Sequence, residues 1–207
     1  METNWAEESL KTIRILMERS AIYRRALAPI MLFAGFVGVL AAAVGILLHL
    51  DSATAFGYLW LDTALFAFVG ALLIARRQAI KDKESFWSPP ARRVVQAMLP
   101  SWLVGLIGDS VFQVIAVSNP QLIWWLPPIW MVLYGFALYG AGFFMPRGIR
   151  FFGWLFMGSG CGVFCAILED WVDLQFTAHW LMGFFFGVLH LAYGAYLYLT
   201  EKGKNAA

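Results

Sequence analysis

Long apolar stretches alternate with short polar segments along the chain. A transmembrane helix needs roughly 20 mostly apolar residues in a row, and six stretches approach that length. They run near Leu27–Leu50, Phe56–Ala75, Val94–Ser118, Leu122–Phe144, Phe151–Leu168 and Thr177–Leu199. Each is continuously apolar rather than alternating, which favours helices over a barrel. The pattern predicts an all-α integral membrane protein with six transmembrane helices, arranged as three in-out-in hairpins.

The segment before the first stretch has a different pattern. Asn4 and Glu7 have the spacing of a helix-capping pair, and Leu10, Ile13 and Met17 fall on one helical face. This predicts an amphipathic helix on the membrane surface. The alternative is a docking helix for a cytoplasmic partner or a second protomer. We therefore expect an interfacial helix over residues 1–25, a transmembrane domain over 26–200 and a short cytoplasmic tail over 201–207.

Composition excludes other classes of protein. Of the 207 residues, 61% are hydrophobic and 14% are charged, whereas a soluble domain is about half apolar and about a quarter charged. The two cysteines are too few for a disulfide scaffold, and 17% aromatic residues exclude a disordered chain.

The placement of charge predicts the orientation. All fifteen Lys and Arg residues lie in the N-terminal segment, in the loops after the second and fourth stretches, or in the tail. The opposite loops contain Asp51, Glu169, Asp170 and Asp173 and no basic residue. The positive-inside rule therefore places both termini in the cytoplasm. The basic loops indicate topology and do not indicate nucleic-acid binding.

Small and aromatic residues predict how the helices pack and sit. Gly158 with Gly162, and Gly183 with Gly187, have the small-xxx-small spacing that lets helix backbones approach closely. They would join the last hairpin internally or form a seam between protomers. Tryptophans near the predicted span ends are typical of an interfacial belt. These tryptophans are Trp60, Trp87, Trp124, Trp125, Trp171 and Trp180.

Polar and ionisable residues inside a membrane are expensive and mark candidate functional sites. The candidates are Asp62, Asp109, Gln113, Glu169, His179 and His190. His190 follows His179 by eleven residues, about three helical turns, so the two lie on nearly the same face. In one interpretation these residues line an outward-facing polar cavity for a cation, a proton or a small polar solute. In the other, Asp62 and Asp109 are buried structural residues that pair with backbone, tyrosine or tryptophan groups, and the acids in the loops face water.

Motifs for metal, cofactor or covalent chemistry do not occur. There is no HExxH, nucleophile elbow, P-loop or dinucleotide fingerprint, and Cys161 and Cys165 are one helical turn apart on one helix. A pair at that spacing packs more readily than it forms a disulfide. We therefore predict no catalytic residues, no metal and no cofactor.

The loop Ser85-Phe86-Trp87-Ser88-Pro89-Pro90 is the most distinctive string, with Ser88 as the expected N-cap and Pro89 as the first helical residue. Together with the N-terminal run Ser9-Leu10-Lys11-Thr12-Ile13-Arg14 and the stretch Met17-Glu18-Arg19-Ser20, it resembles a group of small, uncharacterised, multi-span bacterial membrane proteins. The resemblance implies a bacterial inner membrane and no particular chemistry.

Two functions remain open. The first is a non-enzymatic membrane module, such as a scaffold, a sensor or an accessory subunit, which binds the lipid bilayer and a second copy or another membrane protein. The second is a small transporter or channel that uses the polar cavity. The inner halves of the spans are almost wholly apolar, which favours the first.

Overall fold

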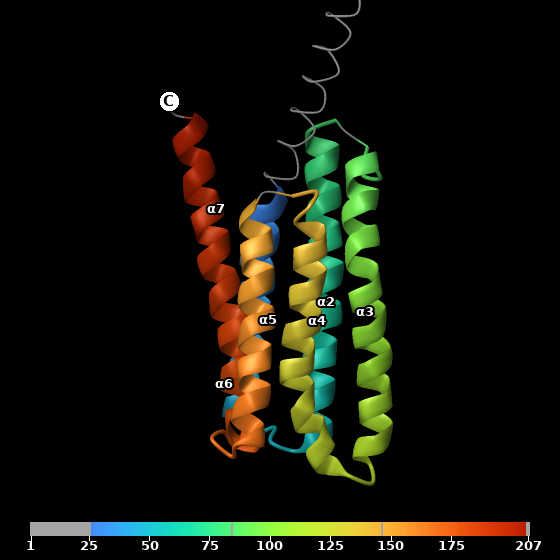
Figure 1. Cartoon of the computed structure of the whole chain (residues 1–207). Coiled ribbons are helices and arrows are strands. Elements are labelled where there is room, and N and C mark those ends of the chain that lie inside the picture. The colour runs from blue at the N-terminus through green and yellow to red at the C-terminus, as the bar shows by residue number, and fades with distance from the viewer. Residues whose placement is uncertain (1–25, 84, 146, 206–207) are drawn as a thin grey trace, which may run out of the picture.

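The computed structural model describes residues 26–83, 85–145 and 147–205, and every regular element within them is a helix (Figure 1). The elements are a first span Ala26–Leu47, α2 Ala53–Lys81, α3 Pro89–Ala116, the 3-10 turn η1 Pro120–Trp125, α4 Leu126–Ala141, α5 Arg147–Leu168, α6 Leu174–Met182, the π-helical segment η2 Gly183–Val188, and α7 Leu189–Asn205. Six helices are long and apolar enough to cross a membrane, which confirms the predicted number of spans. The predicted amphipathic helix lies outside the described residues.

The helix ends follow from local sequence. The Ser52 hydroxyl accepts a hydrogen bond from Ala55 N at the start of α2, and an Asp173 carboxylate oxygen accepts one from Gln175 N at the start of α6. Ser88 precedes Pro89 at the start of α3, as expected. The first span ends at Leu47; beyond it, His49 has a φ of 51°, and the amide of Leu50 donates back to Gly45 O at 2.9 Å. This is the geometry of a Schellman cap.

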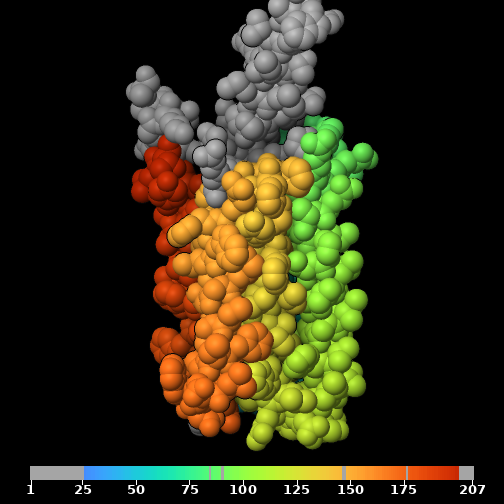
Figure 2. Space-filling view, in the orientation of Figure 1, coloured from blue at the N-terminus to red at the C-terminus, as the bar shows by residue number. Residues whose placement is uncertain are grey.

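The helices run side by side, and their connections alternate between two ends of the bundle (Figure 1). We call the end with Arg76, Arg77, Arg92 and Arg93 the basic end, and the end with Asp51, Glu169, Asp170 and Asp173 the acidic end. On one face α4 lies between α5 and α3 (Figure 2).

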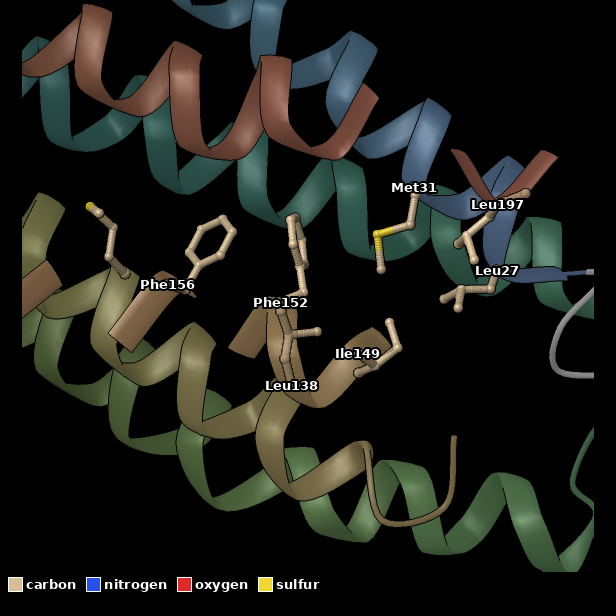
Figure 3. Close-up of a cluster of buried hydrophobic side chains, with 9 residues drawn as sticks. Leu27, Met31, Leu138, Ile149, Phe152, Phe156 and Leu197 are labelled. Atoms are coloured by element: carbon tan, nitrogen blue, oxygen red, sulfur yellow. The ribbon is translucent and has the colours of Figure 1, made fainter. Parts of the chain in front are cut away.

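The main core lies in the half of the bundle nearer the basic end. Leu27 and Met31 of the first span, Leu197 of α7, and side chains of α4 and α5 meet there and are buried (Figure 3). The α5 contribution is Ile149, Phe152 and Phe156. This core therefore joins the first span and α7, which are far apart in the sequence, to α4 and α5.

Glycines hold the first span against the last one. A Cβ at Gly35 would lie 2.6 Å from Leu191 N, and one at Gly187 would lie 2.9 Å from Val39 N. Gly183 meets Ala42 in the same seam. The Gly183–Gly187 pair therefore packs against the first span. The sequence had predicted packing within the last hairpin or between protomers.

The other predicted glycine pair behaves differently. A Cβ at Gly158 or Gly162 would meet no atom of the described chain within 4 Å, so this face of α5 is open there. The close contact between α5 and α4 uses Gly153 and Gly135 instead. A Cβ at Gly153 would lie 2.8 Å from Gly135 O of α4.

The α2 and α3 helices are packed less completely than the rest. Only 6% of the most apolar stretch of each is buried, compared with 44% for the span Pro120–Ala141. They contact each other through Phe68 and Trp102, whose ring centroids are 5.1 Å apart, and α3 meets α4 where Gly140 approaches Ala97. Most of the surface of these two helices is left for lipid or another molecule.

Candidate functional site

His179 of α6 is buried and joins three segments near the acidic end. Trp60 Nε1 of α2 lies 3.2 Å from His179 Nδ1, and His179 Nε2 lies 3.2 Å from the Leu50 carbonyl oxygen. An indole N–H only donates and a carbonyl only accepts. The imidazole is therefore neutral, with its proton on Nε2. Gly45 makes room for it, since a Cβ there would overlap the imidazole ring.

Trp60 corrects one expectation. It was predicted to belong to the interfacial belt, but its side chain is 2% exposed and its indole N–H donates a hydrogen bond to His179. A tryptophan near a span end turns inward when a buried acceptor satisfies its N–H. Trp87, Trp171 and Trp180 are exposed.

His190 is buried among aromatic rings between α7, α4 and α5. The Tyr134 hydroxyl lies 2.8 Å from His190 Nε2, and His190 Nδ1 lies 3.0 Å from the Phe185 carbonyl oxygen. Because the carbonyl only accepts, Nδ1 donates to it, and when the ring is neutral Nε2 accepts from the Tyr134 hydroxyl. The rings of Phe152 and Phe156 pack edge-on against the imidazole.

The two histidines do not share a face. His179 faces the first span and α2, whereas His190 faces α4 and α5. The segment η2 lies between them and is π-helical. A π-turn contains more residues than an α-turn, so eleven residues complete fewer than three turns.

Asp109, which is buried, and Gln113, which is half-buried, are the remaining polar candidates in the described spans. They lie one turn apart on α3, and Asp109 is 1% exposed. Within the described chain, both Asp109 carboxylate oxygens and Gln113 Nε2 are buried without a hydrogen-bond partner. The Gln113 amide occupies the space that a Cβ at Gly57 of α2 would need. Sequence reasoning missed Gly57, although a glycine inside a span marks a close approach.

This pair could accept a small guest. A carboxylate buried without a partner is costly and must be protonated or neutralised by a cation. Two carboxylate oxygens beside an amide are suited to a proton, a water molecule or a small hard cation. A larger metal centre lacks ligands here, since no group of three or more His, Cys, Asp or Glu side chains in the described ranges could hold a metal ion.

Asp62 and Glu169 complete the candidate set, and both are exposed. Asp62 lies on α2, and Glu169 follows the end of α5. The six candidates thus occupy different environments: two histidines with internal partners, two exposed acids, and the Asp109–Gln113 pair.

Comparison of the chain with family models, with curated proteins and with solved structures finds no match.

Proposed function

We propose that the chain is a non-enzymatic, multi-pass module of a bacterial inner membrane that acts as a scaffold, a sensor or an accessory subunit. Its spans form three in-out-in hairpins with both termini in the cytoplasm, as the placement of the basic residues indicates. It works by lateral association of α2 and α3 with another membrane protein.

The observation that carries this proposal is the uneven packing of the bundle. The first span is held to η2 and α7, and α4 is held to α5, by glycine contacts that involve backbone atoms. Tightly packed interfaces of this kind do not slide easily past one another. Outside this unit, α2 and α3 leave nearly all of their most apolar stretches unburied. A rigid unit with an open helix pair is suited to assembly.

Site-specific photo-crosslinking in native membranes tests this proposal. A photoreactive residue is placed at Leu65 or Val69 of α2, or at Val114 of α3, all of which are exposed. Phe151 and Trp154 of α5, also exposed, are the control positions. We expect discrete protein adducts from α2 and α3 and only lipid adducts from α5. Lipid adducts alone from every position would contradict the proposal.

A second function, transport of a cation, a proton or a polar solute, is supported by the unpartnered Asp109–Gln113 pair. Proteoliposomes test it with two probes, proton flux by an enclosed pH dye and sodium uptake by isotope. Transport through Asp109 predicts that Asp109→Asn lowers one flux to the level of empty liposomes, while Glu169→Gln retains the flux. Equal flux in wild type and Asp109→Asn excludes this role.

A further inference from the structure

Asp62 lies deep in the apolar layer. It is nine residues after Ala53, the first residue of α2, and fourteen before Arg76, which at the helical rise is about 14 Å from the start of α2 and about 21 Å from Arg76. The hydrocarbon layer is about 30 Å thick, so a layer centred between these two residues has its middle about 4 Å from Asp62.

Asp62 belongs to a regular exposed row on α2. Tyr58, Asp62, Leu65, Val69 and Leu72 are all exposed, and their spacing of four, three, four and three residues is that of the seam in a left-handed helix pair. We call this row the Asp62 seam. Leu65, Val69 and Leu72 are aliphatic and Tyr58 is a neutral aromatic residue with one hydroxyl group, so Asp62 is the only carboxyl group in the seam.

Lipid tails can cover the apolar members of the seam but cannot solvate a carboxylate. Among the residues that the structure describes, Asp62 has no hydrogen bond or ion pair. Intramembrane acids normally face a bundle interior or a water-filled cavity and pair with another polar group. A cationic side chain of another molecule would complement Asp62 in its charged form.

A second copy of this chain does not offer a cation at that depth. No Lys or Arg lies between Arg25 and Arg76, between Arg93 and Arg147, or between Arg150 and Lys202. A symmetric pairing through the seam would bring two carboxyl groups together. Charge complementarity therefore favours a different protein.

We infer that the Asp62 seam binds a transmembrane helix of another protein that carries a Lys or Arg side chain near the centre of the bilayer. The apolar members of the seam provide the packing surface. The pairing of Asp62 with the cation fixes the depth and the register, because sliding either helix by one turn would leave two charges in hydrocarbon. This inference rests on the proposed function and names the chemistry of the partner.

Synthetic host helices provide the probe. A leucine-rich peptide of roughly 21 residues carries one Lys at its centre, one Lys near its end, or Leu at every position. Its association with the full chain in lipid nanodiscs is measured by energy transfer to a fluorophore on the chain. We expect the central-Lys peptide to bind about tenfold more tightly than the other two.

Two matched variants test whether the preference for the central-Lys peptide depends on the Asp62 carboxylate. Asp62→Asn keeps the shape but removes the charge and should bring all three peptides to the same affinity. Glu169→Gln removes an exposed acid at the acidic end and should leave the tenfold preference unchanged. An equal affinity of wild type for all three peptides, or a preference that survives Asp62→Asn, overturns the inference.

A second-copy interface is tested in the same membranes. With Cys161→Ala and Cys165→Ala as background, Leu65→Cys reports contact between copies by disulfide formation, and a dimer that disappears in Asp62→Asn would replace the inferred partner by the chain itself. If the chain does not prefer the central-Lys peptide but Leu65 still forms photo-crosslinks to another protein, the cationic partner is wrong. The proposed lateral association of α2 and α3 with another protein then remains supported. If those protein crosslinks are absent as well, the proposed function fails.

Discussion

At the scale of single residues, the buried histidines act as ties between helices. His179 uses one ring nitrogen for Trp60 and the other for the Leu50 carbonyl, and His190 similarly serves Tyr134 and Phe185. Each imidazole is fully bonded in its neutral form. Hydrogen bonds of this kind fix the rotation of one helix relative to its neighbours, because each ring has only one donor and one acceptor.

Trp60→Phe tests the first tie. It removes the indole N–H that donates to His179 Nδ1 in the described part of the chain and leaves that buried acceptor unpaired, so we expect the free energy of unfolding to fall by about 1–3 kcal/mol. Unfolding by a denaturing detergent in mixed micelles measures it. Trp180→Phe makes the same chemical change at a side chain that is 66% exposed and should cost much less. Equal losses for both variants would mean that the hydrogen bond contributes little.

Replacement of Asp109 should have the opposite effect on stability. Its carboxylate oxygens are buried without partners among the described residues, so Asp109→Leu, which nearly keeps the shape, should raise the free energy of unfolding by about 1–3 kcal/mol. His190→Leu removes a fully bonded ring and should lower it. If both variants destabilise the fold in the same unfolding assay, then Asp109 has a structural role. A gain in stability would identify Asp109 as a residue retained for function.

At the scale of helices, glycine placement determines which spans come together. The seam between the first span and η2–α7 brings backbone atoms within reach at Gly35 and Gly187. No side-chain rotation can relieve a clash with a backbone atom. Added volume there must separate the helices.

Gly35→Ala therefore should destabilise the fold. Its Cβ would meet Leu191 N at 2.6 Å and Gly187 O at 2.8 Å, and overpacking of this kind costs about 1–3 kcal/mol. Gly158→Ala adds the same methyl group where nothing lies within 4 Å, and should be neutral or stabilising by up to about 1 kcal/mol. Thermal unfolding in detergent compares the two. A Gly158→Ala variant as unstable as Gly35→Ala would indicate a general helix effect and would remove the support for the seam.

The sequence predicts the helices well and their contacts poorly. Apolar length alone locates six spans, and Ser88 with Pro89 locates the start of α3, because both signals are local. The direction of His190 depends on the π-helical segment η2, which changes the count of residues per turn and has no marker in the apolar pattern. The partner of Gly183 and the inward rotation of Trp60 depend on residues far away in the chain, namely Ala42 and His179.

At the scale of the whole molecule, packing and charge are both asymmetric. A glycine-packed unit forms one part of the bundle, and α2 and α3 stand beside it with most of their surface open. Along the bundle axis, basic residues mark one end and acidic residues the other. The first asymmetry concerns association within the membrane plane, and the second concerns orientation across the membrane.

Orientation is open to a direct test. From the negative surface potential of the cytoplasmic leaflet and the insertion bias of Lys and Arg, we expect the basic end to lie inside. In a background of Cys161→Ala and Cys165→Ala, we expect Val172→Cys at the acidic end to react with a membrane-impermeant maleimide in intact cells. Lys83→Cys at the basic end should react only after permeabilisation. Labelling of Lys83→Cys in intact cells would reverse the orientation. Because one lysine contributes little to a bias set by fifteen basic residues, a further variant, Gln78→Cys, reports on the same end with every charge retained.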